Sequence, residues 1–117
     1  YFLNPYTFLI SLSEMLKKRS YIIFLHTPNS SSLSFYFNKN LSFLEFNKMY
    51  FIPNRNSLTY FLNQINLKEI KFEFPYLNSP YRNLIIDILS FIKNIFGYKN
   101  LNYSFPGNVF NAIYQKK

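Results

Sequence analysis

The spacing of apolar residues in the first part of the chain changes from a helical period to a strand-like run. From Pro5 to Arg19 apolar side chains recur every three or four positions, which predicts an amphipathic helix capped by Asn4. The run YIIFLH, Tyr21 to His26, is short, continuous and rich in β-branched residues, which predicts a buried strand. Leu33 to Leu44 alternates as much as it follows a helical period, and we assign it to a helix.

The middle of the chain holds three extended patterns separated by polar residues. Leu44 to Ile52 (LEFNKMYFI) and Ser57 to Leu62 (SLTYFL) read as strands on either side of the polar break PNRNS. A second polar stretch follows, and then Ile70 to Phe74 (IKFEF) alternates cleanly between apolar and polar residues. We therefore expect a long polar β-hairpin between Phe51 and Phe74.

The last part of the chain contains an apolar segment and a late turn. Leu84 to Phe96 supports two readings, a single helix with one apolar stripe or a strand followed by a helix from Ser90. Gly97 follows at the position where a helix C-cap takes a positive φ. The pair Pro106-Gly107 then turns the chain into a final strand, Val109 to Gln115.

The order of these elements predicts the fold class. After the first helix it reads β, α, β, hairpin, β, α, β, which is typical of an α+β, ferredoxin-like βαββαβ domain with a long β-hairpin. We assign residues 20–117 to this single domain and residues 1–19 to an N-terminal helical extension.

The charge of the chain favours a polyanionic partner. Thirteen Lys and Arg stand against five Asp and Glu, which gives a net charge of +8. Nucleic acid is the first candidate and an anionic membrane surface the second. The longest uncharged stretch, Ser20 to Asn38, is interrupted by TPNSSS, and Leu84 to Phe96 is too short, so we expect no membrane span. The abundance of Phe, Tyr, Asn, Lys and Ile fits AT-rich codons, and we expect a mitochondrial or plastid origin.

Residues able to carry catalytic chemistry are scarce. His26 is the single histidine, cysteine is absent, and the five acids are scattered without a paired motif. Two glycines are too few for a phosphate-cradling loop. We expect a protein that is not an enzyme and that uses no metal, cofactor or small-molecule substrate.

Basic residues lie among aromatic ones, and this combination is typical of RNA-binding surfaces. Lys and Arg pair with phosphates, while Tyr and Phe stack on unpaired bases. Taken singly, each of these residues is better explained as a solvated charge or a core ring, whereas for the set the net charge of +8 favours RNA. The candidate RNA contacts are Arg55, Lys68, Lys71, Tyr81, Arg82, Lys17, Lys18, Arg19, Lys116 and Lys117.

Several segments of the second half resemble the small-subunit ribosomal protein ten family. They are FIPN (Phe51 to Asn54), SLTYFL, LKEIKFEF (Leu67 to Phe74), YRNLIIDIL (Tyr81 to Leu89) and FPGNVFNAIY (Phe105 to Tyr114). The resemblance implies the βαββαβ order, a long hairpin that contacts rRNA, and a last strand that completes the sheet. The N-terminal segments NPYTFLISLSEML and HTPNSSSL are similar instead to the small-subunit ribosomal protein eight family.

Both resemblances imply a structural constituent of the small subunit of an organellar ribosome. Such a protein would bind ribosomal RNA and other ribosomal proteins in the mitochondrial matrix, or in a plastid. Two alternatives remain at the level of sequence. One is an accessory structural subunit of a mitochondrial respiratory or ATP synthase complex, and the other is a free single-strand RNA-binding module.

Overall fold

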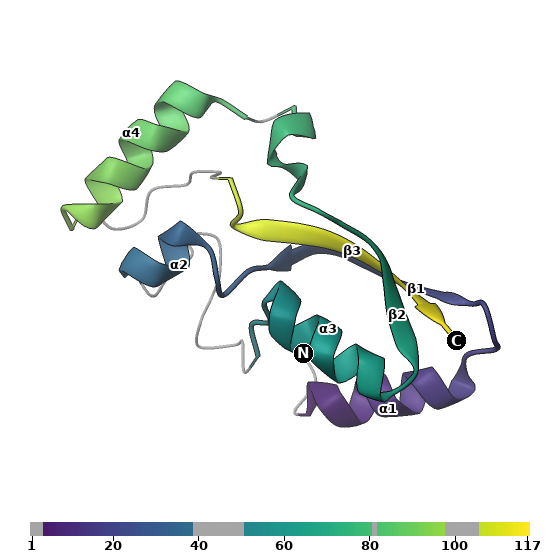
Figure 1. The fold of residues 1–117 in the computed structure, drawn as a ribbon. Coiled ribbons are helices and arrows are strands. Elements are labelled where there is room, and N and C mark those ends of the chain that lie inside the picture. The colour runs from purple at the N-terminus through teal and green to yellow at the C-terminus, as the bar shows by residue number, and fades with distance from the viewer. Residues whose placement is uncertain (1–3, 39–50, 81, 98–105) are drawn as a thin grey trace.

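The computed structural model describes residues 4–38, 51–80, 82–97 and 106–117, which form a mixed α+β structure (Figure 1). The described elements are, in chain order, α1 (Pro5–Met15), β1 (Tyr21–Pro28), α2 (Leu33–Asn38), α3 (Arg55–Gln64), β2 (Leu67–Glu73), the 3-10 helix η2 (Pro75–Asn78), α4 (Leu84–Ile95) and β3 (Val109–Lys116). No helix among these residues is both long and apolar enough to cross a membrane.

The last strand of the chain is the central strand of the sheet. The described strands follow the order β1-β3-β2, and β3 is antiparallel to both neighbours. Gly107 (φ +84°) allows the turn that precedes β3, as the Pro-Gly pair predicts. The side chain of Asn29 holds this turn, because its Nδ2 donates to the Gly107 carbonyl at 2.8 Å. The strand that follows this late turn, β3, therefore lies between two strands that are far apart in the sequence.

Helices α1 and α3 cover one face of the sheet, and the core lies between them and the strands (Figure 1). On β3, every second side chain is buried, which is the alternation expected of a strand with one covered face. Ala112 pairs with Phe24 on β1 and Phe72 on β2, so the single alanine of the chain leaves room for two rings. The buried core residues are Leu9, Leu58, Leu62, Leu67, Phe110, Ala112 and Tyr114.

The predicted hairpin between Phe51 and Phe74 is wrong. Helix α3 occupies most of its first arm, and only its second arm is a strand, β2. Asn54 starts the helix with a capping box, in which its Oδ1 accepts from the Ser57 N–H at 2.9 Å and its own N–H donates to Ser57 Oγ at 3.2 Å. Leu58 and Leu62, four residues apart, place one apolar stripe on the core. The run SLTYFL was thus a helical stripe that also fits alternation over its short length.

The other sequence predictions have mixed outcomes. The strand at Tyr21 to His26, the single-helix reading of Leu84 to Phe96 and the positive φ of Gly97 (+93°) are confirmed. The first helix ends at Met15 rather than Arg19, because Leu16 is already extended. Residues 39–50, which hold the rest of the second predicted helix and most of LEFNKMYFI, lie outside the described residues.

The α+β class is confirmed, whereas the ferredoxin-like arrangement is not. A ferredoxin-like sheet has four strands with a parallel pair at its centre. The sheet that the described residues form has three strands, and both neighbouring pairs in it are antiparallel.

Candidate nucleic-acid interface

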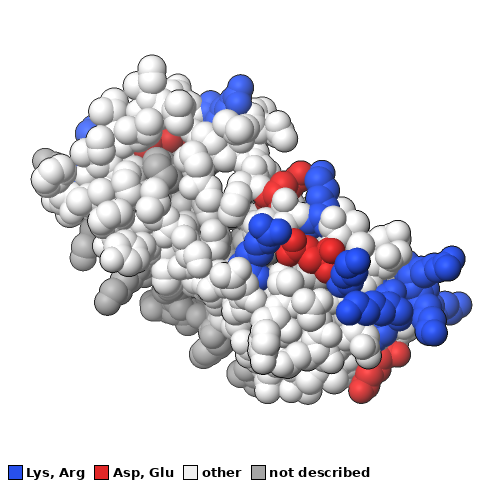
Figure 2. Space-filling view, in the orientation of Figure 1, with Lys and Arg blue, Asp and Glu red and all other residues white. Residues whose placement is uncertain are grey.

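Three segments that are distant in the sequence meet at one end of the sheet, and all three are basic. Backbone hydrogen bonds join the Arg19 N–H to the Lys116 carbonyl (2.9 Å) and the Lys117 N–H to the Asn66 carbonyl (2.9 Å). Lys68 pairs across the sheet with Gln115. We call this region the basic end, made of Lys17, Lys18, Arg19, Lys68, Lys116 and Lys117. Figure 2 shows the corresponding gathering of Lys and Arg at the end of the molecule where Figure 1 places the C terminus.

Two residues in left-handed backbone conformation bring these segments together. Arg19 (φ 67°) lies between α1 and β1, and Asn66 (φ 63°) lies between α3 and β2. Both positions reverse the chain within a few residues, so β1 and β2 begin where β3 ends. Asparagine tolerates this conformation better than most residues, whereas arginine adopts it less readily.

The cations of the basic end have two different surroundings. Lys17, Lys18, Arg19, Lys68 and Lys117 are exposed. Lys116 instead turns toward the helices, where its Nζ donates to Ser13 Oγ (2.6 Å) and to the Ile65 carbonyl (3.2 Å). Lys116 therefore joins α1, the end of α3 and β3, and its role in this structure is to hold the fold.

The face of the sheet opposite α1 and α3 continues from the basic end. Tyr21, Gln115 and Lys68 form one row across the three strands. Gln115 Nε2 donates to Tyr21 Oη at 3.0 Å and to the Arg19 carbonyl at 3.3 Å. The exposed Tyr21 ring is thereby held beside the cations, in a position to stack on an unpaired base. Ile23 and Ile113 form part of the next row of this open face.

Sequence reasoning missed Tyr21 and Gln115 as site residues. The run YIIFLH predicts a buried strand, whereas every second residue from Tyr21 to Leu25 is exposed in the structure. No sequence signal identified these two residues. The face of β1 that no helix covers becomes apparent only from the arrangement of the sheet and helices.

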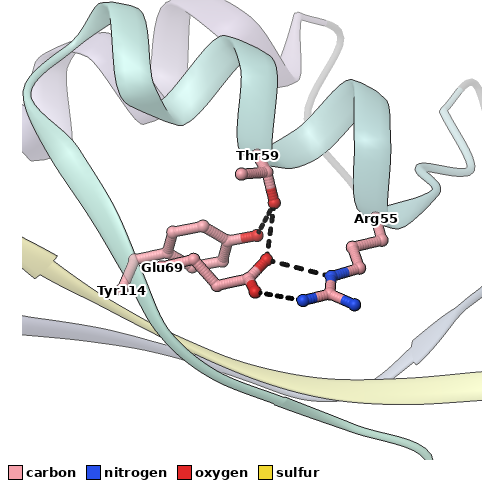
Figure 3. Close-up of polar contacts among 4 residues, drawn as sticks. All are labelled: Arg55, Thr59, Glu69 and Tyr114. Carbon is pink, nitrogen blue, oxygen red and sulfur yellow. Dashed lines mark hydrogen bonds and ion pairs between the residues drawn. The ribbon is translucent and has the colours of Figure 1, made fainter.

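Arg55 does not lie in the predicted hairpin but in a polar cluster between α3 and the sheet (Figure 3). Its Nη2 lies 2.6 Å from Glu69 Oε1, and its Nε donates to Glu69 Oε2 at 3.3 Å. The guanidinium carbon also lies 4.8 Å from the centroid of the Phe72 ring. Arg55 therefore links α3 to β2.

Two hydroxyl groups complete the Arg55–Glu69 cluster. Thr59 Oγ1 donates to Glu69 Oε2 at 2.8 Å, and it lies 2.7 Å from the hydroxyl of Tyr114. Since a threonine hydroxyl has one hydrogen, Tyr114 is the donor in the second bond. Burial raises the pKa of Tyr114, which keeps this phenol protonated.

The remaining predicted contacts do not belong to the basic end, although Lys71 pairs with Ile113 in the next row of the open face. Lys71 forms an ion pair with Glu73, with Nζ 2.7 Å from Oε2. Arg82 donates to the Leu77 carbonyl near the start of α4. Tyr81 lies outside the described residues. Thus the structure gathers six of the ten predicted residues at the basic end and places Lys71 one row away on the open face. It places Arg55 against Glu69 and Arg82 near the start of α4.

The described residues form no cluster of three or more His, Asp or Glu side chains that could hold a metal ion. His26 lies in a bulge of β1, where its backbone N–H donates to Asn111 Oδ1 at 2.8 Å.

The chain matches no protein-family model, no curated protein and no solved structure. Its function is therefore inferred from the geometry of its own residues.

The free energy of unfolding should depend on pH in the acid range through the Glu69 carboxylate. The hydrogen bond from Arg55 lowers the pKa of Glu69 below its ordinary value, with a smaller contribution from Thr59, while burial opposes the shift. Because the folded-state pKa is depressed, the stabilisation is complete above the unfolded-state pKa of 4.5. It is lost as the pH falls through the folded-state value.

We expect Glu69→Gln to lower the free energy of unfolding by about 1 kcal/mol at pH 7, a modest value because solvent screens the exposed Arg55 charge. The difference between the wild type and the variant should shrink below pH 4.5, as measured by urea unfolding from pH 3 to pH 7. Glu14→Gln, which changes an exposed carboxylate on α1, is the control and should have little effect at pH 7. A difference that stays constant down to pH 3 would contradict the assigned pKa shift.

Proposed function

We propose that this protein binds RNA through the basic end and acts as a structural, non-enzymatic component of a ribonucleoprotein. The observation that carries the proposal is the meeting of five exposed cations from three distant segments at one end of the sheet. Lys and Arg side chains grouped in this way neutralise several phosphates of one backbone, which supplies most of the affinity of a protein for nucleic acid.

The open face beside the basic end favours RNA with unpaired bases over a regular duplex. The Tyr21 ring offers a stacking surface, and the Gln115 amide holds it in place. Ile23 and Ile113 extend this surface with aliphatic side chains, and the same row holds Lys71, which is paired with Glu73. A base stacked on Tyr21 would leave its phosphate within the group of cations formed by Lys68 and the Lys17–Arg19 turn.

The finer proposal is that the ribonucleoprotein is the small subunit of an organellar ribosome, in the mitochondrial matrix. The net charge of +8 and the resemblance of the segments LKEIKFEF and FPGNVFNAIY to the ribosomal protein ten family support it. The segment SLTYFL no longer supports it, since α3 is a helix there.

We expect the endogenous protein to co-sediment with the small subunit and to leave it at high salt. Sedimentation with a membrane complex at every salt concentration would contradict the ribosomal assignment.

RNA binding itself is tested by its dependence on salt. We expect a fluorescently labelled, single-stranded 20-nucleotide RNA to bind, with the logarithm of the association constant falling linearly with the logarithm of the KCl concentration. The expected slope is about −3.5, or roughly 0.7 for each of the five exposed cations. Absence of binding at low salt, or a slope near zero, would contradict the proposal.

A further inference from the structure

Helix α4 is oriented opposite to the usual arrangement, with its apolar side chains outward. Its one buried residue is a carboxylate, Asp87, which is 5% exposed. Asn83, Ser90 and Asn94 lie one turn or two from Asp87 and share its side of the helix. The exposed large apolar residues of the segment are Leu84, Ile85, Ile86, Ile88, Leu89, Ile92, Ile95 and Phe96. An outward face of this kind is unfavourable in water and is typical of an interaction surface.

Specific hydrogen bonds hold α4 in this orientation. Tyr76, buried in η2, donates its hydroxyl to Asp87 Oδ2 at 2.7 Å. The Asn83 backbone N–H donates to the same oxygen at 3.2 Å, and the Asn83 side chain caps the helix by accepting from the Ile86 N–H at 3.2 Å. Burial, and secondly the bond to Asp87, raises the pKa of Tyr76 to about 12. The phenol is therefore a donor at physiological pH, and it fixes which face of α4 points outward.

The apolar surface continues from α4 onto α2. The rings of Phe37 and Phe91 are in edge contact, with centroids 6.1 Å apart, and Tyr36 and Phe37 are exposed on α2. We call the exposed apolar residues of α2 and α4 the apolar end. Figure 1 places both helices at the end of the molecule away from the C terminus, and the surface there is mostly uncharged in Figure 2.

The charged residues around the apolar end indicate which kind of partner can bind there. The exposed charged residues of the described segments α2, η2 and α4 and of the connection to α4 are Lys93 and Arg82. A second copy would bring two more cations and no exposed carboxylate from these segments to pair with them. An anionic lipid surface favours cations that surround the apolar helix, whereas five of the nine exposed cations among the described residues lie at the basic end.

We propose that the apolar end docks into an apolar groove of a partner protein, and that carboxylates at the rim of this groove pair with Lys93 and Arg82. Helix-in-groove recognition uses side chains at i, i+3, i+4 and i+7, which Ile85, Ile88, Leu89 and Ile92 supply on one outward arc. This inference does not depend on RNA binding. If RNA binds the basic end and a partner protein binds the apolar end, the chain links an RNA to a protein.

The proposal is tested by photocrosslinking in cells that produce the full chain. With p-benzoylphenylalanine in place of Leu89, we expect one main adduct, with an apolar peptide of another protein that contains Asp or Glu. The same crosslinker in place of Tyr60, which is exposed on α3, is the control and should not give this adduct. Lys93→Glu should lower the adduct yield about tenfold, since it places like charges together, and changing the partner carboxylate to Lys should restore it.

Three outcomes would overturn the inference. They are an adduct with a second copy of the chain, an adduct with lipid, and equal adducts from positions 60 and 89. Flotation of the purified chain with vesicles of phosphatidylcholine and phosphatidylglycerol separates the lipid case. If the vesicles bind the chain and Leu89→Glu abolishes that binding, a membrane is the occupant and the protein partner is refuted. Salt-dependent RNA binding can fail or succeed independently of these results.

Discussion

Replacing Lys18 and Lys68 by Glu is expected to lower the affinity for single-stranded RNA about 100-fold at low salt. The two residues come from different segments but lie at the same end of the sheet. Each substitution removes a phosphate contact and adds a repulsive charge, so about tenfold per site is reasonable, and the salt slope should fall by about 1.4. Fluorescence anisotropy across a KCl series measures both quantities.

The matched control for this variant is Arg82→Glu with Lys93→Glu. It changes the net charge by the same amount, but in α4 and in the connection that precedes it, away from the basic end. Both double variants alter exposed side chains and should keep the circular dichroism spectrum of the wild type. If the two variants lose affinity equally, RNA binding depends on net charge and the basic end has no special role.

Leu62→Ala is expected to lower the free energy of unfolding by about 3 kcal/mol, which is a large part of the stability of a small domain. Leu62 is 0% exposed and packs from α3 onto the core. The truncation leaves a cavity that the helix and sheet fill only partly, because both are held by neighbouring contacts. Urea unfolding followed by circular dichroism measures the loss.

Tyr60→Ala is the control that also tests the helical assignment of this segment. Tyr60 is 70% exposed, and its replacement should cost less than about 0.5 kcal/mol. In a strand, residues 60 and 62 would share one face and have similar burial, whereas in a helix they lie on opposite sides. Equal losses from Leu62→Ala and Tyr60→Ala would therefore favour the hairpin over α3.

The local elements with clear start and stop signals were predictable from the sequence. Asn4 and Pro5 open α1, Gly97 follows α4, and Gly107 precedes β3, each where the residue type requires it. The segment Ser57 to Leu62 was not predictable from periodicity alone. Six residues fit both a helical and a strand period. The helix is distinguished by the Asn54 capping box and by Ile65, which continues the apolar stripe of Leu58 and Leu62 beyond these six residues.

The candidate site was predictable in its residue types and not in its grouping. Net charge and the ends of elements predict solvated cations at Lys17 to Arg19, Lys68 and Lys117. The same pattern fails for Lys116, which turns inward to Ser13 and Ile65. The meeting of these residues depends on β3 entering the centre of the sheet, which no local pattern encodes. The same limit explains Arg55, since its partner Glu69 lies fourteen residues away on a strand that packs against α3.

The orientation of α4 could not have been read from its apolar stripe. A sequence pattern identifies an apolar face, and the usual inference is that this face is buried. Here the bond from Tyr76 to Asp87 reverses the expectation and leaves the apolar face to a partner.

The central claim is that RNA lies on the basic end and the open face beside it, and crosslink mapping tests it most directly. Single-stranded RNA carrying 4-thiouridine would be bound to the purified chain, irradiated, and the crosslinked peptides identified by mass spectrometry. We predict crosslinks within residues 17–24, 67–71 and 111–117, with Tyr21 among the modified residues. Crosslinks concentrated on residues 84–96, with none in those three segments, would contradict it.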